Sequence, residues 1–258
     1  MNNIIKILIV LMLVIFLIPG DTAQMKLNIV GSTSVQPICE ELIEEYKKSH
    51  DDVDINVQGG GSSLGIKCAN QSVADIGMSS KQFDCENLVE HELGSEAIVV
   101  IVNKNNPINE LSSSQLQKVF SGEIKQWNEL TNKSGRINVI VREEGSGTLD
   151  AFKDIIMKNT EIKQNAVVQN SAGSIKQSVI RDENAIGFVS LSHIDNQLKN
   201  LSVDGVFADK KSILDKSYKL QRPFILLTDK NPNNQTSQFI QWIKSSEAQR
   251  ILELEKIF

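Results

Sequence analysis

Stretches typical of β-strands alternate with stretches of helical spacing along almost the whole of this 258-residue chain. Apolar and polar residues alternate over residues 26–30 and 52–57, and residues 97–102 form a continuous run rich in Val and Ile. Apolar residues recur at helical spacing in residues 37–49 and 148–158. The alternation predicts an α/β fold with parallel sheets, in which ligands bind at the carboxyl ends of strands.

Four short turns rich in Ser, Thr and Gly lie where a predicted strand meets a predicted helix. They are residues 31–34, 59–63, 75–80 and 142–148. The first turn of a helix presents N–H groups without intrahelical partners and a partial positive charge. Each turn alone is more typical of a helix N-cap than of a ligand site, because Ser, Thr and Gly are favoured there. Four such turns together favour a cage for a small oxyanion.

The candidate anion-binding residues are the hydroxyl, N–H and charged groups of these turns. They are Ser32, Thr33, Ser34, Ser62, Ser63, Asp75, Arg142, Glu144, Ser146, Gly147 and Thr148. Arg142 is the strong cation of the set, and a guanidinium pairs bidentately with a tetrahedral oxyanion. Glu144 lies two residues further on and is predicted to hold this guanidinium in place. A structural Arg–Glu pair at the surface is the alternative interpretation.

Asp75 is the residue that would select among oxyanions. A carboxylate repels an anion unless the ligand carries a proton, and monohydrogen phosphate carries one whereas sulfate does not. A site that leaves a buried acceptor unpaired against the wrong ligand discriminates by roughly 10⁴–10⁵. We therefore predict that Asp75 accepts the phosphate proton, with a cap at the end of a strand as the alternative role.

Several motifs, in order along the chain, resemble those of the phosphate-binding proteins of ABC importers. They are GSTSVQP at 31–37, GSSLGI at 61–66, ADIGMSS at 74–80, FSGEIKQW at 120–127, REEGSGT at 142–148 and AIGFVS at 185–190. The resemblance runs from about Met25 to the C-terminus. It implies two Rossmann-like α/β domains of the type II periplasmic binding protein class, with the ligand in the cleft between them. The implied domains are residues 25–102 plus 202–258 and residues 103–201, with chain crossings near 102–104 and 201–203.

The resemblance also implies a role for each matching residue. The donors would be Thr33, Ser34, Ser63 with Ser62 beside it, Ser146, Gly147 and Thr148; the acceptor would be Asp75 and the cation Arg142. Two positions depart from the pattern, because Glu144 stands where some members have Asp and Leu149 where many have Arg. The implied protein is a monomeric receptor without a cofactor, which delivers inorganic phosphate to the membrane permease and ATPase subunits of an ABC importer.

Residues 1–24 are predicted to be a signal peptide or an N-terminal anchor. Lys6 precedes a twelve-residue apolar run at 7–18, which is short for a membrane span and typical of a signal peptide. Cleavage and retention as an anchor both stay open, and either indicates an exported protein, periplasmic or on the cell surface. Cys39, Cys68 and Cys85 are interpreted as small buried thiols, with a Cys68–Cys85 disulfide as the alternative.

Charge and motif spacing argue against two other classes of protein. The formal net charge of −5 argues against a nucleic-acid partner. His50, His91 and His193 lack metal-ligand spacing, and Ser146 lacks the nucleophile-elbow pattern, so neither an enzyme nor a metal site is predicted. Two alternatives stay open: a binder of another tetrahedral oxyanion, and a phosphate sensor with the same fold.

Overall fold

The computed structural model describes residues 25–51, 53–83 and 86–258, and these residues form a mixed α/β fold. Nine strands make one sheet in the order β2-β1-β3-β11-β4-β8-β6-β7, with β9 also paired to β4. The strands are β1 (Met25–Gly31), β2 (Val53–Gly59), β3 (Ile76–Ser79), β4 (Leu88–Asn103), β6 (Asn138–Arg142), β7 (Val167–Gln169), β8 (Ala185–Ser190), β9 (Leu198–Asn200) and β11 (Gln221–Asp229). Two short strands, β5 (Glu110–Leu111) and β10 (Ser202–Val203), pair separately.

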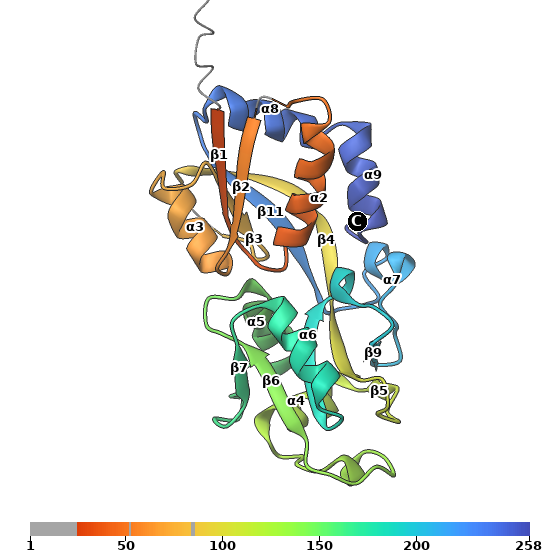
Figure 1. The fold of residues 1–258 in the computed structure, drawn as a ribbon. Coiled ribbons are helices and arrows are strands. Elements are labelled where there is room, and N and C mark those ends of the chain that lie inside the picture. The colour runs from red at the N-terminus through yellow and green to blue at the C-terminus, as the bar shows by residue number, and fades with distance from the viewer. Residues whose placement is uncertain (1–24, 52, 84–85) are drawn as a thin grey trace, which may run out of the picture.

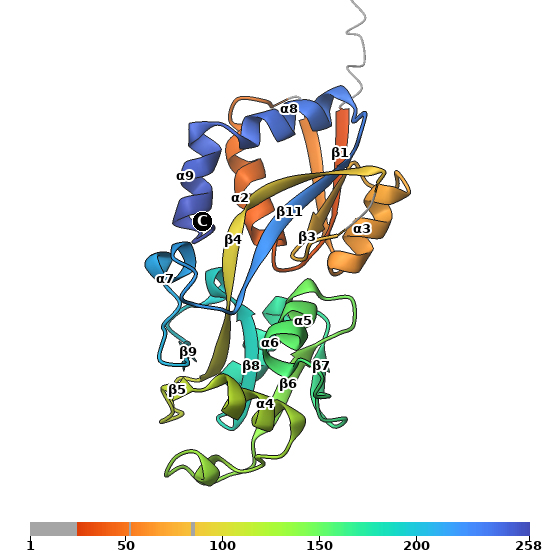
Figure 2. The ribbon, with the colours of Figure 1, turned by 180° about the vertical axis from the view of Figure 1, so that it is seen from behind.

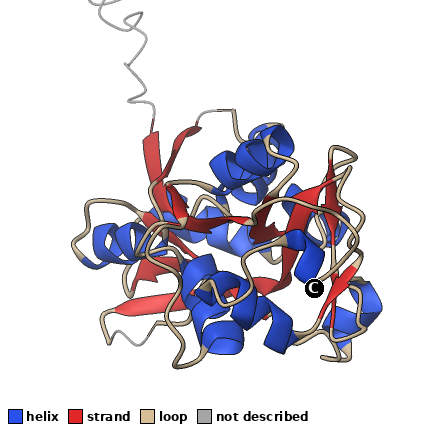
Figure 3. Cartoon of the chain, turned by 90° about the horizontal axis from the view of Figure 1, so that it is seen from below, coloured by secondary structure: helices blue, strands red, loops and turns tan. Residues whose placement is uncertain are grey.

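Helices lie on both sides of the strands, as the view from below in Figure 3 shows. The α-helices are α2 (Gln36–Lys47), α3 (Ser62–Asn70), α4 (Ser113–Ser121), α5 (Gly147–Phe152), α6 (Ala172–Arg181), α7 (Lys210–Leu214), α8 (Asn234–Ile243) and α9 (Ser246–Leu254). Short helical turns follow at η1 (Trp127–Glu129), η2 (Lys153–Met157) and η3 (Leu191–His193). Since α5 continues into the π-helical turn η2, the predicted helix at 148–158 is confirmed, but its second half is wound more widely.

The upper half of the molecule in Figure 1 contains β1, β2 and β3, which run parallel. Strand β11 lies antiparallel to β3 on one side and to the first part of β4 on the other. Because side chains alternate along β1, Leu27 and Ile29 point to the same side and pack in a core with Ile38 and Leu42 of α2. Because these strands run parallel, the carboxyl ends of β1, β2 and β3 lie at one edge of the sheet, which faces the lower half.

The lower half is organised around the second part of β4, which pairs antiparallel with β8 and β9. Strand β6 runs parallel to β8 and β7. A second core fills this half, and its ring cluster includes Phe152 and Phe188, whose ring centroids are 4.1 Å apart. Residues 97–102 are buried as predicted, but their pairing is antiparallel rather than parallel.

Strands β4 and β11 connect the two halves, as the rear view in Figure 2 shows. Strand β4 changes partner from β11 to β8 between Ala97 and Ile98, so the first crossing lies before residues 102–104. The predicted second crossing at 201–203 is also displaced, because Leu201 and residues up to Leu220 pack in the lower core. The chain returns to the upper core only by Phe224 of β11.

Some of the sequence predictions concern residues that the structure does not describe. The apolar run at 7–18 and Cys85 lie outside the described residues, and so does one partner of the Cys68–Cys85 pair. Cys39 is a buried thiol of α2, and burial raises its pKa to about 12. Within residues 25–51, 53–83 and 86–258, no helix has both the length and the apolar character that a membrane crossing requires.

Candidate functional site

The upper wall of the site is built where β1, β2 and β3 end. Gly31 is in register with both Gly59 of β2 and Met78 of β3, so the turns that follow these strands meet. The Ser32 hydroxyl donates to Ser80 Oγ at 3.2 Å, and the hydroxyls of Ser62 and Ser80 are also 3.2 Å apart. The Ser80 N–H donates to Ser62 Oγ at 3.0 Å. Three serine hydroxyls from three turns therefore share one buried point.

The lower wall is the turn between β6 and α5. Ser146 caps α5 by accepting the Leu149 N–H at 3.4 Å, and Gly147 and Thr148 begin the helix. The Thr148 hydroxyl is 3.0 Å from the Ser34 hydroxyl of the upper half. We call Ser32, Ser34, Ser62, Ser80 and Thr148 the hydroxyl cluster; each is 3% exposed or less.

Further contacts hold the two walls together. The Ser63 N–H donates to the Gly145 carbonyl at 3.1 Å, and the Ala172 N–H donates to Thr33 Oγ1 at 3.3 Å. A Cβ placed on Gly147 would lie 2.6 Å from Ser80 Oγ and 2.7 Å from Ser62 Oγ, closer than side chains approach. Only glycine allows α5 to approach the upper wall this closely.

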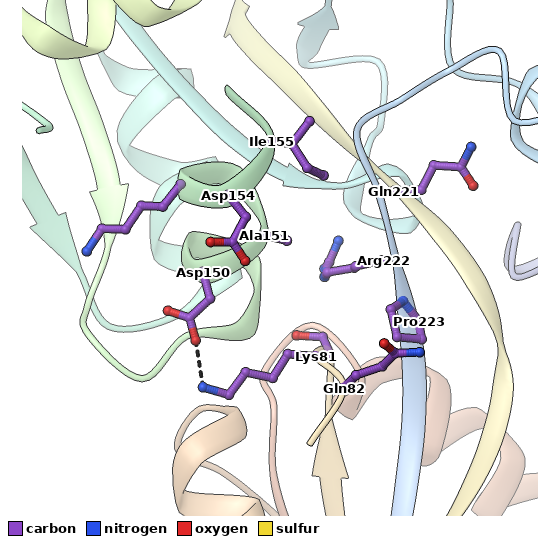
Figure 4. A pocket seen from close by; sticks show the side chains of 11 residues that line it. Lys81, Gln82, Asp150, Ala151, Asp154, Ile155, Gln221, Arg222 and Pro223 are labelled. Carbon is purple, nitrogen blue, oxygen red and sulfur yellow. Dashed lines mark hydrogen bonds and ion pairs between the residues drawn. The ribbon is translucent and has the colours of Figure 1, made fainter. Parts of the chain in front are cut away.

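An ion pair lies at the rim of the site, where a pocket of about 520 Å³ opens between the halves. Figure 4 shows Lys81, which follows β3, reaching Asp150 of α5 at one edge of this pocket, with the two charged atoms 2.6 Å apart. Arg222 and Pro223 of β11 line the same pocket. Lys81 also donates to Ser63 Oγ at 3.3 Å. Because each partner comes from a different half, this pair adds to the contacts across the site.

Arg142 is the buried cation of the site, with a side chain that is 2% exposed. Its Nε and Nη2 donate to the two carboxylate oxygens of Glu143, each at 2.8 Å. Glu144 was the predicted partner, and that prediction is wrong: its side chain is 80% exposed and pairs with Lys153 at 2.7 Å. The side chains of successive residues point in different directions past the end of β6, so Glu143 turns towards Arg142 and Glu144 turns to solvent.

Asp75 does not lie in the site, contrary to the prediction. It precedes the first residue of β3, whereas Ser80 follows the last. Its Oδ2 accepts the Asn28 N–H at 2.8 Å, and its Oδ1 accepts from Asn233 Nδ2 at 2.8 Å. Both carboxylate oxygens of Asp75 are thus engaged at the amino end of β3, where the side chain acts as a cap. The alternative interpretation, a strand-end cap, is the correct one.

The other predicted residues divide into those that join the cluster and those beside it. Ser32, Ser34, Ser62 and Thr148 belong to the cluster, and Ser146 and Gly147 lie in the adjoining turn. Ser63 is exposed, and Thr33 faces the first turn of α6. The sequence interpretation missed Ser80 and Glu143. Ser80 could have been recognised from the sequence, because it directly follows the strand-like residues of β3.

A second buried ion pair lies where β4 and β11 cross between the halves. Arg222 of β11 approaches Glu96 of β4 at 3.6 Å and donates to Ser190 Oγ at 2.6 Å. Burial raises the pKa of Glu96 and lowers that of Arg222 to about 10. Burial and the nearby charge of Arg222 lower the pKa of His193 to about 4, so this ring is neutral at pH 7.

The chemistry of the site is that of oxyanion binding. Hydroxyls and helix N-termini supply donors, and one guanidinium supplies positive charge, largely neutralised by Glu143. His50, His91 and His193 lie outside this group: His50 stacks on Tyr46, and His91 is 2.9 Å from Thr228 Oγ1. The arrangement can hold a small tetrahedral anion by hydrogen bonds from several sides.

Comparisons with known proteins agree with this geometry. A family model described as the PBP superfamily domain matches residues 19–247. The fold is similar to a structure from Clostridium perfringens with bound phosphate, described as a candidate phosphate ABC transporter substrate-binding protein; identity is 38%, TM-score 0.87, and the match covers 90% of this chain and 98% of the other. An ABC-type phosphate transport receptor from Vibrio cholerae is 29% identical, with TM-score 0.73 and coverage of 90% and 99%. The phosphate-binding protein PstS of Bacillus subtilis is 27% identical over 237 residues, covering 89% of this chain and 79% of the relative.

Proposed function

The chain belongs to the PBP superfamily, among the phosphate-binding proteins of ABC importers, and we propose that it captures inorganic phosphate between its two halves. The observation that carries the proposal is the hydroxyl cluster, to which both halves contribute; the buried Arg142 ends β6, the strand that precedes the turn to Thr148. Hydrogen bonds to an anion are about twice as strong as those between neutral groups. The bound phosphate of the relative from Clostridium perfringens supports the identity of the anion.

Two domains that close on the ligand follow from the same proposal. The upper domain comprises the residues of the first core together with β11, α8 and α9, and the lower domain comprises the second core. Strands β4 and β11 form the two crossings, and the contacts between Ser34 and Thr148 and between Lys81 and Asp150 belong to the closed form. The ligand then sits in the cleft between domains.

Titration calorimetry with inorganic phosphate tests the proposal directly. We expect one phosphate per chain. The Ser34→Ala variant should bind more weakly, because it removes one buried hydroxyl of the cluster, by roughly 10-fold or more for a bond to a charged ligand. Ser237→Ala is the matched control, because it removes an exposed hydroxyl of α8, which donates to the Asn233 carbonyl, and should leave the affinity unchanged. A wild-type protein that takes up no phosphate would overturn the proposal.

The proposal also places the chain outside the cytoplasm, as a monomer that delivers phosphate to the permease and ATPase subunits of an importer. The alternative is a sensor that binds phosphate but contacts no transporter. A reconstituted importer from the same organism separates the two roles. Phosphate-loaded protein should stimulate ATP hydrolysis by the importer, whereas phosphate binding without stimulation would support the sensor.

A further inference from the structure

Residue 80 lies at the buried point of the site where three turns meet. Ser80 is fully buried, and its hydroxyl lies within 3.2 Å of two other cluster hydroxyls, those of Ser32 and Ser62. It also faces the lower half, because a Cβ on Gly147 would approach Ser80 Oγ to 2.6 Å. A ligand held between the halves at this place would contact the Ser80 side chain.

The carboxylates of the turn before α5 and of its first turn are engaged, whereas Asp154 lies further along, exposed at the rim of the pocket. Glu143 uses both oxygens to accept from Arg142. Asp150 is paired with Lys81, and Glu144 with Lys153 at the surface. The acceptor that a protonated oxyanion would meet on the β3 side of the site is therefore the hydroxyl of Ser80.

A hydroxyl and a carboxylate treat phosphate and sulfate differently. An ionised carboxylate only accepts, so it rewards the P–O–H group of monohydrogen phosphate and repels sulfate, which has no proton. A hydroxyl carries one donor and two acceptor sites and rotates to suit its partner. It can accept from a P–O–H group or donate to an unprotonated oxygen with similar geometry.

We propose that Ser80 is the specificity-determining residue of this site, and that its hydroxyl admits tetrahedral oxyanions with and without a proton. The inference rests on the proposed function, since it concerns the same site. A fixed buried acceptor discriminates by roughly 10⁴–10⁵, whereas the net difference of one neutral hydrogen bond is about 10-fold. The wild-type protein should therefore prefer phosphate over sulfate by less than about 100-fold.

Calorimetry with inorganic phosphate and with sulfate tests this inference in three proteins. Ser80→Asp supplies the missing fixed acceptor, and it should weaken sulfate binding at least about 10-fold more than phosphate binding. Ser80→Asn is the matched control, because its amide has nearly the same shape without the charge and can donate as well as accept. It should change both affinities by similar factors. Thermal melting of each variant shows whether it is folded.

The outcomes separate the inference from the proposed function. Absence of phosphate binding by the wild-type protein overturns the proposed function itself. Phosphate binding with a wild-type preference over sulfate of about 100-fold or more overturns only the role of Ser80, and this measurement requires no variant. Equal changes in both affinities for folded Ser80→Asp would also overturn it, because residue 80 would then not meet the protonated oxygen of the ligand.

Discussion

Adding one methyl group at Gly147 should weaken phosphate binding without preventing the protein from folding. A Cβ there would lie 2.6 Å from Ser80 Oγ, 2.7 Å from Ser62 Oγ and 2.9 Å from the Ser80 carbonyl carbon. All three atoms belong to the upper half, whereas Gly147 belongs to the lower half. Gly147→Ala should therefore fold normally and fail to close.

The loss of affinity follows from the separation that the methyl group requires. Restoring an ordinary contact of 3.4 Å from 2.6 Å moves the walls apart by about 0.8 Å. The bonds across the site, at 3.0 Å between Ser34 and Thr148 and 3.1 Å between Ser63 and Gly145, would then exceed hydrogen-bond length. Three such bonds, including that of Thr33, contribute about 2–4 kcal/mol, so phosphate affinity should fall roughly 30- to 1,000-fold.

Calorimetry measures this loss, and urea unfolding of the protein without phosphate measures folding. Gly173→Ala is the matched control: it lies in the first turn of α6 in the same half, and its Cβ would meet nothing nearer than Ser171 Oγ at 3.9 Å. We expect the control to bind as the wild type does. The reasoning would be refuted by Gly147→Ala with wild-type affinity, or by a variant that binds poorly only because it is unfolded.

Three further predictions concern charged groups. Asp75→Asn should leave the phosphate affinity within about twofold and lower the free energy of unfolding by about 1 kcal/mol, because Asp75 only caps strands. A large loss of phosphate affinity would show instead that Asp75 acts in the site. Glu143→Gln should lower the free energy of unfolding by about 1–2 kcal/mol by weakening the partner of buried Arg142, whereas Glu144→Gln should change it by less than about 0.5 kcal/mol; urea unfolding would contradict this if the two variants behaved alike. The pKa of His193 is about 4 in the folded state and 6.5 as its ordinary value, so between these values the unfolded chain binds a proton that the folded chain does not. Stability should therefore be complete above pH 6.5 and fall by about 3 kcal/mol as pH drops towards 4, and His193→Gln should flatten that part of the pH profile measured by urea unfolding.

The position of Asp75 follows from the length of the strand that separates it from Ser80. Read as one turn, residues 75–80 predict Asp75 and Ser80 at the same place. A strand rises about 3.3 Å per residue, so five residues span roughly 16 Å. Once residues 76–79 are a strand, Asp75 and Ser80 must lie at opposite ends of it. The sequence therefore contained the information that selects Ser80.

Other features depend on packing that no local pattern records. Residues 97–102 are a buried apolar run whichever half they belong to, so hydrophobicity alone cannot say where β4 leaves one core for the other. Glu143 and Glu144 are the same residue type at adjacent positions, and only the surroundings of each decide which one meets Arg142. The α/β alternation, the cluster hydroxyls Ser32, Ser34 and Thr148 and the family resemblance were recognisable because each is written in local sequence.

The hydroxyl cluster explains how a chain of net charge −5 can bind an anion although the guanidinium of Arg142 is already paired. The cluster hydroxyls hydrogen-bond to one another, as Ser32 and Ser62 do with Ser80, so the buried donors have partners and escape the cost of burial alone. An oxyanion that takes these donors replaces bonds between neutral groups with charge-assisted bonds about twice as strong. Each exchange favours the ligand by the difference, and the donors come from both halves. Phosphate affinity and closure of the two halves therefore depend on the same hydrogen bonds.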